Sequence, residues 1–437
     1  MKVSIDPSIR KGPIRPLHGV GQPPFAGVNF EMFSYLTDAG IPFSRLHDVG
    51  GAYGGFRWVD IPNIFRDFSA DPTDPASYDF TFTDLLITAL VEHGVEPFFR
   101  LGVTIENARH IKAYRIYPPT DNQKWAVICE HIIRHYTEGW ANGFYYNIRY
   151  WEIWNEPDNY EDPMENAMWR GTKEQYFELY DAASKHLKKC FPHLKIGGYA
   201  SCGFYAVKKE FVKEANSSPR KEYFLEFFDA FITHIKKSGA PLDFFSWHSY
   251  SGVESNRIYI SYARQRLDKE GFTKTESICN EWNPIPTNKG TYRHAAETCA
   301  NLLLFQKGKM DAAMFYDARW GIGNYGALFH PETKLPYPAY YAFTAFNELY
   351  KRENEIAVQS DDERVMAVAA KKDNDLCAVI TNHTGDEIPF TLCADARVTR
   401  CLLTANGENE KVIALPDTLP RESILTVFFE TSKETQN

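Results

Sequence analysis

The sequence of 437 residues lacks long hydrophobic runs. No stretch approaches the roughly 20 apolar residues that a membrane-spanning helix needs. The opening segment, MKVSIDPSIRKGPIRP, also lacks the apolar core that a secretory signal carries before its cleavage site. We therefore expect no membrane association, and either a cytoplasmic protein or a secreted one whose signal has been removed.

Excess positive charge and paired cysteines are absent as well. Lys and Arg number 48 against 57 Asp and Glu, and no dense basic block occurs, so a nucleic-acid partner is not expected and a neutral substrate fits better. The 8 cysteines show no C-x-x-C spacing, so we expect reduced, mostly buried thiols and no metal or cofactor. Aromatic residues are plentiful at 15%, which suits both sugar-stacking surfaces and the core of a large barrel.

Eight short β-rich runs recur along the first part of the chain, at 16–21, 43–49, 96–102, 150–157, 195–200, 244–250, 277–283 and 312–319. Segments with helical spacing of apolar residues lie between them, at 82–93, 122–137, 173–190, 220–238, 255–270 and 293–307, with another at 338–349. Such alternation indicates parallel strands, and eight repeats predict a (β/α)8 TIM barrel of the α/β class.

Beyond the barrel the pattern changes to alternating strand-like runs, such as RVMAVAAK and SILTVFFE. These runs predict a small antiparallel β-sandwich. We expect a strand within 1–15 that joins this sandwich, a catalytic barrel over 16–350 and an accessory sandwich over 351–437. The sequence leaves the oligomeric state open, a homo-oligomer included.

Two glutamates stand where catalytic groups of such a barrel are found, at the carboxyl ends of strands. The fourth run ends with Asn155 and Glu156 in WEIWNEP, and the seventh ends with Glu281 in CNEWN. Carboxylates on these two strands face each other across the barrel mouth, where one can protonate a glycosidic oxygen and the other can attack the anomeric carbon. Either glutamate alone would suit a structural ion pair, but the two together favour a glycosidase.

The motifs WEIWNEPD (151–158), MWRGTKEQYFELY (168–180) and HSY (248–250) resemble glycoside hydrolase family 39. That family contains β-xylosidases and α-L-iduronidases, within the clan of retaining barrel enzymes that place their carboxylates on strands four and seven. The resemblance implies that Glu156 is the acid/base and Glu281 the nucleophile. It also implies that Asn155 binds the sugar 2-hydroxyl.

Further candidates for substrate binding end the second and sixth runs. Arg45 and His47 look like the basic pair of the family, with Arg45 holding Glu281 ionised and His47 binding ring hydroxyls. His248 and Tyr250 lie two residues apart, so they point to one face, and they match family residues that contact the sugar and the nucleophile. Packing of the barrel top is the structural alternative for these side chains.

The eighth run departs from the family, because AMFYDARWG stands where the xylosidases carry a Trp platform and two glutamates. Trp320 here, and Trp169 after the fourth run, are predicted stacking walls. Asp317 is predicted to bind a sugar hydroxyl. Arg319 is predicted to pair with Asp317 or to reach the carboxylate of a uronic acid.

The sequence thus predicts a retaining exo-glycosidase, β-xylosidase-like, that acts on an oligosaccharide or glycoside. An α-L-arabinosidase, a β-galactosidase or glucosidase, and a uronidase of the same clan are the alternatives, and CNEWN is similar to the nucleophile strand of α-L-arabinofuranosidases. A catalytically silent carbohydrate-binding protein is the alternative from another class. The presence of both glutamates argues against it.

Overall fold

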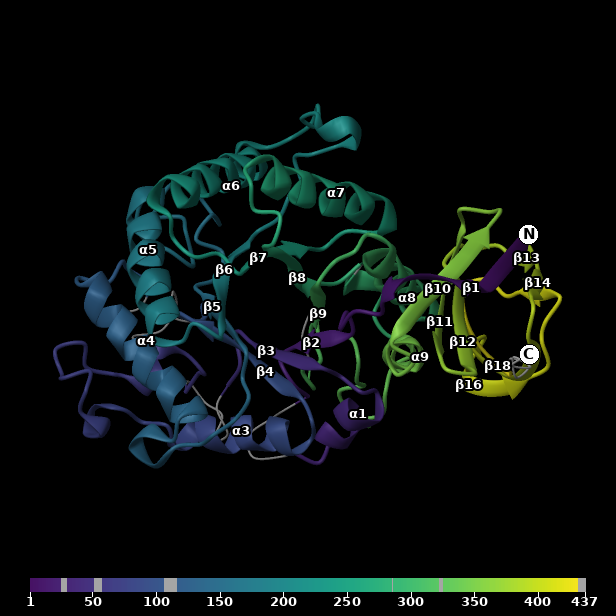
Figure 1. Cartoon of the computed structure of the whole chain (residues 1–437), viewed down its shortest axis with the longest axis horizontal. Coiled ribbons are helices and arrows are strands. Elements are labelled where there is room, and N and C mark those ends of the chain that lie inside the picture. Colours follow the sequence, from purple (N-terminus) through teal and green to yellow (C-terminus); the bar gives the residue numbers. More distant parts are fainter. Residues whose placement is uncertain (25–29, 51–56, 106–115, 285, 322–324, 431–437) are drawn as a thin grey trace, which may run out of the picture.

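A closed barrel of eight parallel strands forms the larger part of the molecule (Figure 1). The computed structural model describes all residues except 25–29, 51–56, 106–115, 285, 322–324 and 431–437. Each barrel strand pairs in parallel with the next one in the chain, and β9 closes the barrel against β2. The strands are β2 (Gly19–Gly21), β3 (Phe43–Leu46), β4 (Glu96–Leu101), β5 (Tyr150–Ile153), β6 (Lys195–Ser201), β7 (Phe244–Ser249), β8 (Glu276–Trp282) and β9 (Ala312–Tyr316).

Helices surround the barrel, so the predicted TIM barrel is confirmed (Figure 1). Their starts follow side-chain chemistry: Thr172 and Gln175 form a reciprocal capping box at the start of α5, and Thr291 caps α8. The helices are α1 (Phe33–Asp38), α2 (Ile61–Ile64), α3 (Thr81–Glu92), α4 (Asn122–Thr137), α5 (Lys173–Cys190), α6 (Pro219–Ser238), α7 (Val253–Lys269), α8 (Tyr292–Lys307) and α9 (Tyr340–Tyr350).

The barrel interior changes from apolar to charged along the strands. A separate apolar cluster near the strand starts contains Phe43, Phe98, Tyr150, Phe244, Ile278, Ala312 and Met314. Because strand side chains alternate between faces, residues two positions further along point inward again. Those residues are Arg45, Arg100, Glu152, Ser246 and Asn280, all of them buried. A layer of buried polar groups therefore lies between the apolar layer and the carboxyl ends of the strands.

The strands outside the barrel form one eight-stranded sheet in the order β14-β1-β10-β11-β12-β18-β15-β16, together with a short β13–β17 pair. The sheet is antiparallel except where β1 runs parallel to β14. Its core is a second apolar cluster that includes Val3, Ile380 and Val427. The strands are β1 (Lys2–Pro13), β10 (Asn354–Ser360), β11 (Val365–Lys372), β12 (Asp375–Asn382), β13 (Ile388–Pro389), β14 (Thr391–Ala394), β15 (Arg397–Ala405), β16 (Glu408–Ile413), β17 (Thr418–Leu419) and β18 (Ser423–Glu430).

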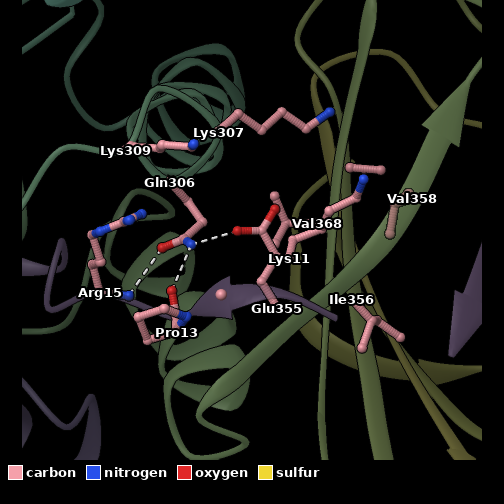
Figure 2. Close-up of a pocket in the computed structure, with 12 residues that line it drawn as sticks. Lys11, Pro13, Arg15, Gln306, Lys307, Lys309, Glu355, Ile356, Val358 and Val368 are labelled. Carbon is pink, nitrogen blue, oxygen red and sulfur yellow. Dashed lines mark hydrogen bonds between the residues drawn. The ribbon is translucent and has the colours of Figure 1, made fainter. Parts of the chain in front are cut away.

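This sheet packs beside α8 and α9 (Figure 1), and the buried Gln306 makes several of the hydrogen bonds between the two parts (Figure 2). The Gln306 amide nitrogen donates to the Pro13 carbonyl at 3.0 Å and to the Glu355 carboxylate at 2.6 Å. Its amide oxygen accepts from the Arg15 backbone N–H at 2.9 Å. The last turn of α8 is thereby tied to the end of β1 and to β10, beside a cavity of about 450 Å³.

Two general expectations can be compared with the structure. Among the described residues, no helix is both long enough and apolar enough to cross a membrane. All eight cysteines are free thiols, and all but Cys190 and Cys393 are buried.

Candidate active site

Arg45 is the centre of the buried polar layer and is only 1% exposed. Its Nη1 donates to Glu281 Oε2 at 3.1 Å, and its Nη2 donates to Asn155 Oδ1 at 2.6 Å. Its Nε donates to Glu152 Oε2 at 2.9 Å. One guanidinium on β3 therefore positions groups from β5 and β8, on both sides of the barrel mouth.

Glu152 is a fully buried carboxylate that the sequence did not identify as a site residue. Besides Arg45, its carboxylate accepts hydrogen bonds from Ser246 at 2.6 Å and from Asn280 at 2.5 Å. These donors make its burial tolerable, because an unpaired buried charge would be costly. The sequence did carry a sign of it, because side chains alternate between the two faces of a strand and this alternation along WEIWNEP points Glu152 into the barrel.

Glu281, at the end of β8, receives two donors. The Tyr250 hydroxyl donates to Oε1 at 2.5 Å, and Arg45 donates to Oε2. A phenol and a guanidinium thus bind the two oxygens of this carboxylate through separate hydrogen bonds. The carboxylate is also fixed in direction, which suits a group that must attack a single carbon atom.

Glu156 follows β5 in a tight turn, with φ of 46°, and Trp154 before it has φ of 72°. Such left-handed backbone is unfavourable for these residues and needs compensation from surrounding contacts. The Trp154 indole supplies one contact by donating to the Met168 carbonyl at 2.8 Å. The Glu156 side chain contacts His248 Nδ1 through Oε1 and accepts from Asn159 Nδ2 through Oε2, both at 2.8 Å.

His248 lies between the two glutamates and is fully buried. Its Nε2 is 3.6 Å from Glu281 Oε2, and one oxygen of each glutamate lies within 4.8 Å of the other and of the ring. Burial lowers the pKa of His248, but the charges of Glu281 and Glu156 outweigh it and raise the pKa overall. Burial by itself would raise the pKa of Glu156. The hydrogen bond and charge of His248 lower that pKa by more, so its net direction is downward. Glu156 and His248 can therefore share one proton across their hydrogen bond.

A cavity of about 490 Å³ opens above this cluster. Five of the predicted residues line it: His47, Asn155, Glu156, Tyr250 and Glu281. His47 is kept neutral, because burial first, then the charges of Arg100 and Arg45, hold its pKa well below the ordinary value. A neutral imidazole can exchange hydrogen bonds with sugar hydroxyls as donor or acceptor.

The predicted stacking role of Trp169 is wrong. Its side chain is 1% exposed, its indole donates to the Thr172 carbonyl at 2.9 Å, and its ring packs on Trp154 and Tyr176. Trp320 also does not line the cavity in the described part of the chain. Its indole donates to the Pro331 carbonyl at 3.0 Å, and Lys334 lies over its ring.

Asp317 and Arg319 are likewise set apart from the cavity lining. Asp317 is fully buried and accepts the Arg319 backbone N–H at 3.1 Å, which shapes the turn after β9. Burial raises the pKa of its carboxyl to about 7. The Arg319 guanidinium is 3.7 Å from Asp317, so the alternative of a structural pairing describes these residues, and a direct contact of Asp317 with sugar is not supported.

Several lining residues escaped prediction, notably Asp48, Tyr316, Tyr325 and Arg220. Asp48 follows the predicted pair Arg45 and His47, and Tyr316 precedes Asp317, so proximity in the sequence could have found both. The rings of Tyr325 and Tyr250 lie 5.1 Å apart, and those of Tyr325 and Tyr316 lie 5.6 Å apart. These tyrosines provide the aromatic wall that was expected from Trp169 and Trp320.

A TIM barrel with paired carboxylates at the carboxyl ends of strands four and seven is an arrangement found among glycoside hydrolases. This chain belongs to glycosyl hydrolases family 39, which matches residues 54–316.

Two β-xylosidases are related in sequence. That of Caldicellulosiruptor saccharolyticus is 24% identical over 345 residues, which cover 70% of this chain and 64% of that protein, so the chain spans just under two thirds of its length. That of Geobacillus stearothermophilus is 23% identical over 375 residues, covering 75% and 68%.

Solved structures share the fold along nearly the whole chain. A glucosidase from Croceicoccus marinus superposes with a TM-score of 0.78 at 20% identity, covering 99% of both chains. A monomeric β-xylosidase from Caulobacter crescentus CB15 superposes with a TM-score of 0.68 at 16% identity, also covering 99% of both.

Proposed function

We propose that this protein is a retaining exo-glycosidase that removes a terminal sugar, with β-D-xylosides as the leading substrate class. The observation that carries the proposal is the pairing of Glu156 and Glu281, whose nearest carboxylate oxygens lie within 4.8 Å in one cavity. Retaining enzymes hold their carboxyl groups about 5–5.5 Å apart, whereas inverting enzymes leave roughly 6.5–9.5 Å for a water.

The contacts support a division of roles between the glutamates. Glu281 is the nucleophile, because Arg45 and Tyr250 stabilise its anion and aim it. Its attack on the anomeric carbon forms a glycosyl-enzyme ester as the bond to the leaving oxygen breaks. Asn155 assists by binding the sugar 2-hydroxyl: its carbonyl already accepts from Arg45, which leaves its NH2 to donate.

Glu156 is the acid/base of this proposal. The proton that it shares with His248 passes to the leaving oxygen as the first bond breaks. In the second step Glu156 accepts a proton from the water that hydrolyses the ester, so the proton count is restored.

The exo action is supported by the shape of the site. The cavity is lined by Tyr250, Tyr316 and Tyr325, whose rings contact one another, and its volume of about 490 Å³ suits a short ligand. Xylose is favoured by the two related β-xylosidases. A glucoside is the second candidate, because the glucosidase structure covers 99% of this chain.

A panel of aryl glycosides tests the proposal, comprising xyloside, glucoside, galactoside, arabinosides and iduronide. We expect phenol release from the xyloside, with the β-anomer of xylose as the first product detected by NMR. Cleavage of polymeric xylan only at internal bonds would contradict the exo assignment. Ligand-induced stabilisation without any phenol release would instead indicate a silent carbohydrate-binding protein.

A further inference from the structure

We propose that the leaving-group side of this cavity selects an anionic aglycone, such as one that carries a uronic acid, through Arg220 and Lys221. The inference rests on the proposed glycosidase function and names the substrate class for the same site. Both residues line the cavity, and both belong to the first turn of α6.

The position of Arg220 places it next to the leaving group. The leaving oxygen must lie beside Glu156, which protonates it, and the atoms that it carries extend away from Glu281. On that side of Glu156 stands Asn159, which donates to Glu156 Oε2. Arg220 is the next group outward, because its Nε donates to the Asn159 carbonyl at 2.8 Å. An aglycone in this cavity therefore meets the Arg220 guanidinium.

The guanidinium is held in place by neutral groups alone in the described part of the chain. It donates a second hydrogen bond to Asn159 Oδ1 at 3.2 Å. Its central carbon lies 4.3 Å from the Tyr160 ring centroid and 5.4 Å from that of Phe224. Amide and ring contacts fix its direction and leave its positive charge uncompensated, which prepares it for a carboxylate.

Two other cations near this end of α6 are paired with carboxylates. Lys213 forms an ion pair with Glu222, and Lys173 forms one with Glu226 at 2.7 Å. Lys221 contacts no carboxylate among the described residues, although its backbone N–H donates to Ser218. Arg220 and Lys221, which are adjacent in the sequence, therefore both line the cavity without a carboxylate partner among the described residues. A guanidinium and an ammonium without carboxylate partners gain more from an anionic ligand than from a neutral one.

Two matched aryl xylosides test this inference. One aglycone ends in a carboxymethyl group and the other in the neutral carboxamide, so that the methylene keeps the two phenols similar in acidity. We expect kcat/KM for the carboxylate to exceed that for the amide at least about fivefold at low salt, with the ratio approaching one at high salt. If the panel identifies another sugar, that sugar replaces xylose.

Substitutions separate charge recognition from positioning. Arg220→Gln should lower the ratio of kcat/KM for the carboxylate to kcat/KM for the amide. This substitution also removes the hydrogen bonds that hold Asn159, which in turn contacts Glu156. Its effect on the amide substrate therefore measures the loss of Glu156 positioning. Lys221→Gln removes a charge without touching Asn159 and should also lower the ratio. Lys237→Gln is the matched control, because Lys237 is exposed in the last turn of the same helix.

The outcomes distinguish this inference from the proposed function. Equal kcat/KM for both aglycones in the unaltered protein, with phenol released from each, would overturn the anionic selectivity and leave the glycosidase intact. A ratio that Lys237→Gln lowers as much as Arg220→Gln does would overturn it too, because net charge would then suffice. No phenol from either compound, or from any glycoside of the panel, would contradict the glycosidase itself.

Discussion

At the scale of single residues, the structure surrounds each of the two glutamates proposed to react with groups that position its charge. Arg45 and Tyr250 both contact Glu281, and His248 and Asn159 both contact Glu156. Each of these carboxylates thus has hydrogen-bond partners of distinct chemistry. Removing a partner should therefore reduce activity by a different factor than removing the carboxylate itself.

Glu156→Ala tests the acid/base role. Only protonation and water activation are lost, so aryl glycosides with good leaving groups should still form the glycosyl-enzyme, and added azide should restore turnover. The measurement is phenol release from activated and unactivated substrates, with and without azide. Equal loss on every leaving group, without rescue, would refute the assignment.

Tyr250→Phe tests the support given to the nucleophile. Loss of one hydrogen bond to a charged group should lower kcat/KM by about 10- to 100-fold, mainly through kcat. Tyr325→Phe is the comparison, since Tyr325 lines the same cavity and, in the described part of the chain, its hydroxyl does not donate to Glu281. An equal loss in both variants would show that the Tyr250 contact has no special role.

Asp317→Asn tests the buried carboxyl beside β9. Because burial raises the pKa of Asp317 from 3.8 to about 7, the folded protein holds a proton that the unfolded chain releases. Stability from this group is thus present below about pH 4 and is lost as the pH rises toward 7. The melting temperature of Asp317→Asn, relative to the unaltered protein, should therefore rise between about pH 5 and about pH 8, reflecting on the order of 2–4 kcal/mol.

The exposed Asp373→Asn is the control for this comparison. Its melting temperature relative to the unaltered protein should stay nearly constant across the same pH range. A constant difference for Asp317→Asn as well would show that Asp317 is ionised in the folded protein.

At the scale of elements, the periodicities predicted the barrel because each strand and helix carries its own apolar pattern. Glu156 and Glu281 were predicted as a pair for the same reason, since they end strands whose direction the fold dictates. Glu152 and Arg100 were missed, because inward alternation marks a core position without revealing that the core layer is charged.

The course of the loops was not predictable in the same way. Trp169 follows the fourth strand as a sugar platform would, yet the loop turns its indole into the core beside Trp154. Arg220 reaches the site from the start of α6, and its contact with Asn159 connects it to Glu156. Such long-range contacts depend on how loops pack together, which local spacing does not record.

The contact between α8 and the sheet, which Gln306 makes, gives a prediction at this scale. Gln306→Leu leaves a carboxylate, a carbonyl and an N–H without their buried partner, which should cost about 2–4 kcal/mol of unfolding free energy. Denaturant unfolding measures the change. Gln265→Leu, at an exposed position on α7, should stay within about 0.5 kcal/mol of the unaltered protein.

At the scale of the whole molecule, the sheet and the catalytic cavity occupy separate places. The sheet packs on α8 and α9 (Figure 1), whereas the cavity is lined by side chains at the carboxyl ends of barrel strands and from the start of α6. All residues with a proposed catalytic role therefore belong to the barrel, and the sheet covers the outer side of α8 and α9. Retaining hydrolysis by Glu156 and Glu281 is the central claim that remains for experiment.

Covalent trapping tests that claim most directly. A 2-deoxy-2-fluoro glycoside slows hydrolysis of the glycosyl-enzyme, so the ester can accumulate on the nucleophile. After proteolysis, mass spectrometry should find one fluoro-sugar on the peptide that contains Glu281, and Glu281→Ala should remain unlabelled. A label on another residue, or labelling of Glu281→Ala at the same rate, would contradict the account.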